Sequence, residues 1–343
     1  MTALGGGRST AIGSMPGTDA RVAAEVVIGE LDIPTLPELP ARGLGADMIG
    51  RAAAILVDMP VDVAASGYRL AARPTMLMRR AVDLLRQDLD AVEEFWERSG
   101  RDGAESDLTI SCVGPYTFAA SAELPSGHKI IADRGATADV VDSLTEGLSS
   151  LVAEVARRLG VRVNLQLDEP LIGRVIDGHI TPLTRLNVIE AVPAAVAGER
   201  LTAVFTGVGV PGILHDCGTL RADLVAAMPP MTSGQVAWSV DLGQVRGGAD
   251  LDAIGSLLDG GGELVAGAVE SVRTQPAPHL DDVLARLISL VDRIGLPRSV
   301  LAEQVLVSPA CGLAGATDDW SREALSLCSR AAAALADDPE AIG

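Results

Sequence analysis

The sequence is poor in aromatic residues, cysteine and histidine. Aromatic residues make up 2% of the 343 positions, whereas hydrophobic residues make up 48%. A large core must therefore be built from Ala, Val, Leu and Ile, which suits helices packed on buried parallel strands. The four cysteines are too few and too scattered for a disulfide framework. We therefore expect a reducing compartment, in which an unusual cysteine is a ligand or a nucleophile.

Positive charge is also scarce. The chain has 27 Lys and Arg residues against 46 Asp and Glu residues, a formal net charge of −19, and no basic cluster offsets this. Such a surface repels phosphate backbones and anionic lipids, so we expect neither a nucleic-acid nor a membrane partner. The N-terminus has no basic region followed by an apolar block, and no run of about 18 apolar residues follows. We expect a cytoplasmic protein.

Short β-branched runs alternate with segments of helical period, which is the pattern of βα units. The candidate strands span 9–14, 34–40, 108–115, 161–170, 212–218, 235–242, 263–270 and 303–312. Apolar residues at three- and four-residue steps predict helices over 76–100, 135–160 and 279–295. Eight units predict an α/β fold, a single (β/α)8 TIM barrel over 9–340, preceded by a flexible glycine-rich segment over 1–8.

The unusual residues fall at the carboxyl ends of these strands. The stretches concerned are "IGS", "ELP", "VGP", "DEP", "HDCG", "VDLG", "AVES" and "PACG". In a barrel the carboxyl ends of all strands converge on one mouth, where active sites are built. A two-domain doubly wound fold would scatter them, so their placement favours the barrel.

The stretch "HDCG" is a candidate metal site. His215 and Cys217 are two positions apart, so a strand would present both side chains to the same side. Zinc prefers such nitrogen and sulfur ligands. Cys311, in the similar context "SPACG", is a third candidate ligand, and Asp241 in "WSVDLG" is a fourth. The alternative is that His215 and Cys217 are buried residues with satisfied hydrogen bonds, the interpretation we give to Cys112 and Cys328.

Two further stretches carry candidate binding groups. In "LQLDEP" alternation places Asp168 on the same side as Gln166 and Asn164, with Glu169 on the opposite side; a solvated loop carboxylate is the alternative. In "STAIGSMPGTD" a glycine and Ser14 precede a helix start, so backbone N–H groups and a hydroxyl are available to a small carboxylate.

The stretches "TAIGSMPGTD", "GPYT", "LQLDEP", "HDCG" and "SPACGL", in this order, resemble the catalytic half of cobalamin-independent methionine synthase. The chain is similar to a short, single-barrel form of that family. The resemblance implies a (β/α)8 barrel in which zinc activates the thiol of homocysteine for methylation. It implies zinc ligands at His215, Cys217 and Cys311. The family's glutamate ligand has no counterpart, and Asp241 is its closest substitute.

The resemblance also implies how homocysteine binds. Ile12, Gly13 and Ser14 correspond to the family's Ile-Gly-Ser, which holds the amino-acid carboxylate, and Asp168 corresponds to the aspartate that holds the amino group. A further substrate-binding glutamate is expected where Arg42 stands, and Glu38 is the residue that would replace it.

The donor side departs from the family pattern. After strand seven the family has an Asp-x-His pair whose histidine protonates the leaving folate; here Glu270, a candidate catalytic residue, and Val272 stand there. We therefore expect a methylated corrinoid protein, whose leaving group needs no proton, in preference to methyltetrahydrofolate. The alternatives are a zinc methyltransferase for another thiol, a uroporphyrinogen-decarboxylase-like barrel, and a non-catalytic zinc-binding partner of another methyl-transfer protein.

Overall fold

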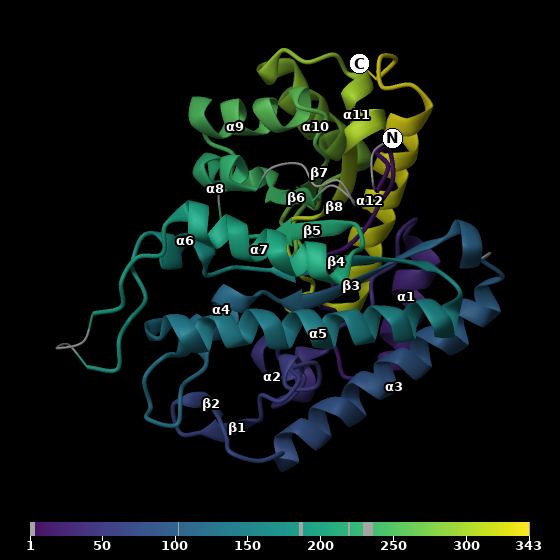
Figure 1. Ribbon diagram of the computed structural model, residues 1–343. Helices are drawn as coiled ribbons and strands as arrows, with labels where there is room; N and C mark the ends of the chain where they lie inside the picture. The colour runs from purple at the N-terminus through teal and green to yellow at the C-terminus, as the bar shows by residue number, and fades with distance from the viewer. Residues whose placement is uncertain (1–3, 102, 185–187, 219, 229–235, 343) are drawn as a thin grey trace.

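Six parallel strands form a curled sheet whose order follows the chain (Figure 1). The computed structural model describes residues 4–101, 103–184, 188–218, 220–228 and 236–342. The strands are β3 (Asp107–Val113), β4 (Arg162–Asp168), β5 (Gly212–His215), β6 (Val236–Asp241), β7 (Leu264–Val269) and β8 (Val305–Pro309). Because neighbouring strands are parallel, each connection must cross back over the sheet, and helices make these crossings. All six carboxyl ends therefore lie at one edge, which we call the mouth.

Helices cover the outer face of the sheet (Figure 1). The helices before the sheet are α1 (Ala20–Glu30), α2 (Met48–Ala52) and α3 (Met76–Ser99). Those between strands are α4 (Pro115–Ser121), α5 (Arg134–Leu159), α6 (Ile172–Ile176), α7 (Ala194–Val208), α8 (Ala222–Ala227), α9 (Gly248–Asp259), α10 (Leu280–Ile294) and α11 (Ser299–Gln304). The chain ends on α12 (Asp318–Asp337).

The three long helices predicted from periodicity are confirmed to within a residue or two at their ends. Their ends have local causes. At the start of α3 the Thr75 hydroxyl accepts a hydrogen bond from the Met78 N–H, and at the start of α5 the Asp133 carboxylate accepts from Gly135 and Ala136. Gly100 and Gly160 follow the last turns in the left-handed conformation that ends many helices.

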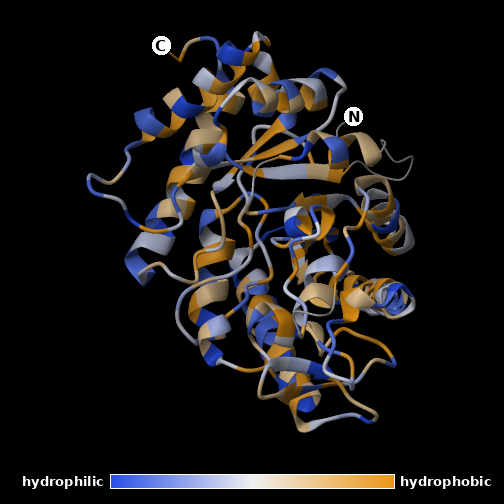
Figure 2. Cartoon of the chain, turned by 90° about the vertical axis from the view of Figure 1, so that its left-hand side faces the viewer, coloured by the Kyte–Doolittle hydropathy of each residue, from blue (hydrophilic) through white to orange (hydrophobic). Residues whose placement is uncertain are grey.

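The strands are buried on both faces. Every residue of β3, β7 and β8 is buried; β7 and β8 are nearly continuous apolar runs, whereas β3 alternates apolar residues with buried Asp107, Thr109 and Ser111. Figure 2 shows mostly orange strands at the centre, covered by helices that carry both colours. The apolar face of each helix packs on the sheet, and the polar face meets solvent.

Two of the eight predicted strands are not strands in the structure. Residues 9–14 and 34–40 make only isolated parallel bridges: Ser9 with Val307 of β8, Thr35 with Thr109 of β3, and Ser14 with Glu38. Three prolines in 34–40 lack the N–H that a ladder requires. In the first segment Gly13 has a φ of +119°, outside the strand region. The barrel prediction is thus confirmed for six strands and the α/β class, and a closed eight-stranded ladder is not formed.

An antiparallel hairpin that the sequence did not predict lies between residues 34–40 and α3. It consists of β1 (Val61–Ala64) and β2 (Gly67–Leu70). The predicted flexible segment 1–8 lies partly outside the described residues. Within it, Leu4 is buried and the Gly7 N–H donates to the Val305 carbonyl at 2.9 Å. Among the described residues no helix has the length and apolar character needed to span a membrane.

Candidate metal centre

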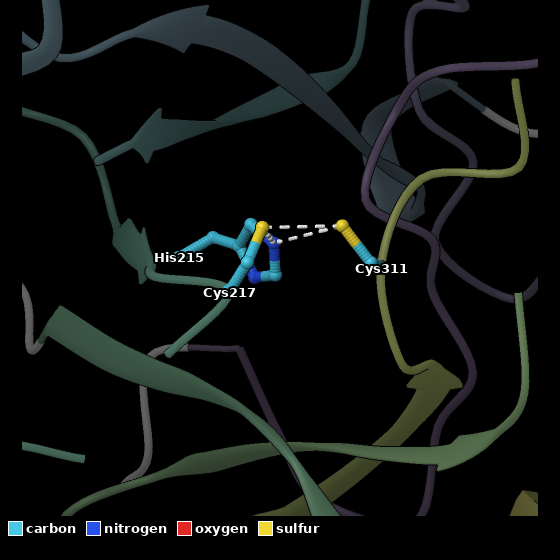
Figure 3. Close-up of side chains that lie close together, drawn as sticks. All are labelled: His215, Cys217 and Cys311. Atoms are coloured by element: carbon cyan, nitrogen blue, oxygen red, sulfur yellow. Dashed lines mark hydrogen bonds between the residues drawn. The ribbon is translucent and has the colours of Figure 1, made fainter. Parts of the chain in front are cut away.

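Three sulfur- and nitrogen-bearing side chains meet at the mouth. His215 is the last residue of β5, Cys217 follows it by two positions, and Cys311 follows the end of β8 by two. Figure 3 shows the three side chains pointing toward one another from these two sides of the sheet. Residues 94 or more positions apart in sequence are thus brought together because β5 and β8 both end at the mouth.

The donor atoms of this group are close enough to share one ion. Cys217 Sγ lies 3.3 Å from His215 Nε2 and 3.2 Å from Cys311 Sγ, and Cys311 Sγ lies 3.7 Å from His215 Nε2. All three donor atoms fall within 4.8 Å of one another. One imidazole nitrogen and two sulfurs form a donor set that suits zinc, with room left for a further ligand. The residues present therefore fit a bound metal.

The side chains of Cys217 and Cys311 are hydrogen-bonded to one another. Their mutual hydrogen bond lowers the pKa of Cys311 to about 4, assisted by the His215 side chain, and it raises the pKa of Cys217, as burial also does. One thiol of the pair is thus ionised near neutral pH and the other is held protonated. Since metals bind thiolates, this pair is partly prepared for a cation before one arrives.

Asp241, the predicted fourth ligand, lies outside this group of donors among the described residues. It is the last residue of β6, and its carboxylate accepts hydrogen bonds from the Gly243 N–H at 2.8 Å and from Gln244 Nε2 at 3.2 Å. Two positions earlier on the same side of β6, Ser239 Oγ lies 2.9 Å from His215 Nδ1.

Asp168 is buried at the carboxyl end of β4, beside the metal centre in the sheet register. Gln166, on the same side of the strand as predicted, donates from Nε2 to the Asp168 carboxylate and to the Ile12 carbonyl, both at 2.7 Å. Burial raises the pKa of Asp168 well above its ordinary value, and the Glu38 carboxylate raises it further. Two buried carboxylates near one another are an attractive environment for a cationic group.

Glu38 lies beside the segment that contains Gly13. The Glu38 N–H donates to the Gly13 carbonyl at 3.0 Å, and its carboxylate accepts from the Ser111 hydroxyl at 3.1 Å. Burial raises the pKa of Glu38, whereas the Arg51 guanidinium and the Ser111 hydrogen bond oppose that rise. Gly13 is required here, since a Cβ at this position would lie 2.4 Å from the Ser111 oxygen. Glu38 therefore faces the segment predicted to bind a carboxylate.

Ser14 connects that segment to the metal centre. Its carbonyl accepts from the Leu313 N–H at 2.7 Å, and its hydroxyl occupies the space beside Gly312. A Cβ on Gly312 would lie 1.9 Å from the Ser14 oxygen, so no other residue fits without displacing Ser14. The predicted carboxylate-binding segment is thus packed against Gly312, the residue after the candidate ligand Cys311.

Glu169 faces away from the mouth, as alternation predicted. Its buried carboxylate accepts from the backbone N–H groups of Tyr116 and Thr117 and from the Thr117 hydroxyl, at 2.7 to 2.8 Å. It thus pairs with N–H groups at the start of α4, the helix that follows the neighbouring strand β3. Burial raises its pKa to about 7, although these hydrogen bonds oppose the rise.

The raised pKa of Glu169 predicts a pH-dependent stability. The carboxyl of Glu169 stays protonated up to about pH 7 in the folded protein, whereas in the unfolded chain it loses its proton near the ordinary value of 4.5. Its contribution to the free energy of unfolding is therefore complete below pH 4.5 and is lost as pH rises through 7. The full effect is about 3 kcal/mol. Urea unfolding at pH 5 to 8 should show the free energy of unfolding of wild type falling relative to that of Glu169→Gln, whose neutral amide does not titrate. A constant difference would contradict the prediction; the exposed Glu25→Gln is the control.

The remaining predicted residues lie at the edges of the site. Glu270 is half-buried, pairs with Arg286 at 2.6 Å and has one carboxylate oxygen without a partner. Val272 is 59% exposed. Arg42 is buried and pairs with Asp88 at 2.7 Å, so its charge is neutralised away from Glu38.

Several residues that complete the site were not predicted as site residues. The Ser111 hydroxyl contacts the Glu38 carboxylate, and the Ser239 hydroxyl contacts the His215 ring. The Gln244 side chain contacts the Cys217 carbonyl, and the Ser271 side chain contacts the Cys311 N–H. For Ser239 the sequence does hold a signal: it lies two positions before Asp241 and so shares its side of the strand.

The chain is similar to known proteins over nearly its whole length. The family model for the catalytic domain of cobalamin-independent synthases matches residues 8–334. A B12-independent methionine synthase from Shewanella sp. W3-18-1, in complex with selenomethionine, superposes with a TM-score of 0.60 at 12% identity, covering 95% of this chain and 97% of its own. A methyltransferase from Methanosarcina mazei gives 0.57 at 14%, covering 95% and 93%. These likenesses show a shared fold. No curated protein matches the chain.

Proposed function

We propose, from the premise that the chain belongs to the family of cobalamin-independent methionine synthase catalytic domains, that it transfers a methyl group to the thiol of homocysteine, forming methionine. The observation that carries the proposal is the convergence of His215, Cys217 and Cys311 beside Asp168 at one end of the sheet. In this proposal the three donors hold zinc, and the bridged segments 9–14 and 34–40 complete a (β/α)8 barrel around them.

The chain's own residues would bind and orient the amino acid. The backbone N–H groups and hydroxyl of Ile12, Gly13 and Ser14 are placed for its carboxylate, and Asp168 with Glu38 for its ammonium group. Both carboxylates are buried, and burial raises the pKa of each, so a substrate ammonium group would stabilise their charged forms. Since Ser14 packs against the residue after Cys311, a substrate bound in this way extends its thiol toward the metal donors.

The acceptor thiol needs to be ionised to attack. A free thiol has a pKa near 8.5 and is only slightly ionised at neutral pH, and bound zinc would lower that value. In the transfer the sulfur–carbon bond forms as the bond between the methyl group and its carrier breaks, with the electron pair remaining on the carrier. The thiol proton leaves to solvent.

The donor side of the site lacks an acid in the expected place. Val272 stands there and is exposed at the mouth, while Glu270 is paired with Arg286. We therefore propose a methylated corrinoid protein as the donor, since its leaving group takes the electron pair without a proton.

The donor is tested with the purified, zinc-loaded chain and homocysteine. We expect methionine from methylcobalamin, the simplest methylated corrinoid, and none from methyltetrahydrofolate, because no group at Val272 protonates the folate. Methionine is quantified by mass spectrometry. Formation of methionine from methyltetrahydrofolate would refute the donor proposal, and failure with both donors while zinc is bound would refute methionine synthesis by this chain. The zinc-free protein is the control.

We propose homocysteine as the acceptor, in preference to a thiol without an ammonium group, because of the ion pairs that the buried arginines and carboxylates form. The rival acceptor was suggested by Arg42, which replaces an expected glutamate. Arg42 is paired with Asp88, which also accepts from Arg51 at 2.9 Å. The carboxylate beside Gly13 is that of Glu38. Glu38 Oε1 lies 3.4 Å from Arg51 Nε, so Asp168 is the buried carboxylate that remains for an ammonium group, with Glu38 near it.

A further inference from the structure

Strand β6 makes two contacts with the candidate metal donors, and the first is between Ser239 and His215. The register of the sheet places Ser239 directly beside His215, and both side chains are buried. Ser239 Oγ lies 2.9 Å from His215 Nδ1. Because the hydroxyl occupies Nδ1, the other ring nitrogen, Nε2, faces Cys217 and Cys311 at 3.3 and 3.7 Å. The hydrogen bond thus fixes both the orientation of the ring and the nitrogen that is available to a metal.

The second contact runs through the turn that follows β6. Asp241 accepts from the Gly243 N–H through one carboxylate oxygen and from Gln244 Nε2 through the other. The same Gln244 Nε2 donates to the carbonyl of Cys217 at 2.6 Å. The Asp241 carboxylate therefore orients the Gln244 amide, and that amide binds the backbone carbonyl of Cys217, a candidate metal donor.

We propose that β6 and the turn after it position two of the metal donors: Ser239 orients His215 at the end of β5, and Asp241, acting through Gln244, fixes the backbone of Cys217. The protein then contributes three donors, and the remaining coordination position is left for the substrate thiol. This inference rests on the proposed zinc site. It reassigns Asp241 from a fourth ligand to a positioning residue, because each of its carboxylate oxygens already accepts a hydrogen bond, one from Gly243 and the other from Gln244.

Removal of the Ser239 hydroxyl should weaken metal binding. Loss of a hydrogen-bond partner of a metal ligand typically costs about 10- to 100-fold in metal affinity. We expect Ser239→Ala to bind zinc weaker by this factor and Ser239→Thr, which keeps the hydroxyl, to restore most of the affinity. The matched control is Ser308→Ala: Ser308 is also a buried strand serine, but its hydroxyl bonds to the Pro309 carbonyl.

Zinc affinity is measured on the full chain by competition with a chromophoric chelator. Nitrogen NMR of the His215 ring provides a readout that loss of stability alone would not change: we expect a single tautomer in wild type and Ser239→Thr, and a mixture in Ser239→Ala. Equal zinc affinity and an unchanged tautomer in Ser239→Ala would overturn the role of Ser239. A wild-type chain that binds no zinc would instead overturn the proposed function.

The Asp241 arm is tested with a double-mutant cycle. If Asp241 acts through Gln244, Asp241→Ala and Gln244→Ala should each weaken zinc binding by a similar factor, and the double variant should be no weaker than either, because the two residues form one pathway. If Asp241 is a ligand, its loss should exceed that of Gln244→Ala and the two losses should add. Additive losses, or a change in the cobalt(II) absorption spectrum in Asp241→Ala alone, would overturn its positioning role.

Discussion

Replacement of Cys217 or Cys311 by serine is expected to abolish stoichiometric zinc binding. Structural zinc sites are worth about 10 to 16 kcal/mol for roughly four ligands. One thiolate therefore accounts for about 2.5 to 4 kcal/mol, which weakens the affinity by about 100- to 1,000-fold. We expect one zinc per wild-type chain and little in either variant after dialysis against a weak chelator, measured by atomic emission. A serine hydroxyl is too weakly acidic to replace a thiolate.

The controls separate ligand loss from loss of fold. Cys328 is fully buried in α12, away from the mouth, and Cys328→Ala should retain one zinc per chain. Circular dichroism should show that all three variants are folded. The proposed metal centre is refuted if Cys217→Ser and Cys311→Ser both keep full zinc occupancy under the conditions in which wild type does.

Local sequence was sufficient to predict the elements whose causes are local. The helix over 76–100 was predicted from apolar spacing, and the structure shows it from Met76 to Ser99, capped by Thr75. The strands predicted over 9–14 and 34–40 form only isolated bridges, because three prolines lack the N–H groups of a ladder and Gly13 has a positive φ. The hairpin of β1 and β2 is not among the elements that the sequence pattern predicts.

The sequence predicts those site residues that lie at the carboxyl ends of strands, because these ends meet at one edge of the sheet. His215, Cys217 and Cys311 meet because parallel strands end at one edge, a consequence of topology that the pattern already implied. What alternation could not supply was the register between β5 and β6. Ser239 and Asp241 share a side of the strand, and only the sheet register shows that Ser239 is level with His215. The pairing of Arg42 with Asp88, 46 residues away, was equally out of reach.

Substitution of Asp168 by asparagine is expected to weaken homocysteine binding by about 30- to 5,000-fold while leaving zinc bound. Asp168 is buried, so a substrate ammonium group beside it has no solvent to replace the lost charge. Removal of one partner of a buried, hydrogen-bonded charge pair costs about 2 to 5 kcal/mol, and this range gives the expected factor. Calorimetric titration of the zinc-loaded protein with homocysteine measures the change.

The choice of acceptor gives this experiment its control. A thiol without an ammonium group, such as 3-mercaptopropionate, should bind wild type and Asp168→Asn with similar affinity, because it never meets the carboxylate as a cation. Asp107→Asn makes the same chemical change in a buried carboxylate at the opposite end of β3, where it pairs with Arg8 and Arg162, and it should leave homocysteine binding unchanged. If Asp168→Asn binds homocysteine as tightly as wild type, the amino group is held elsewhere, and the second buried carboxylate, that of Glu38, is then the residue to replace.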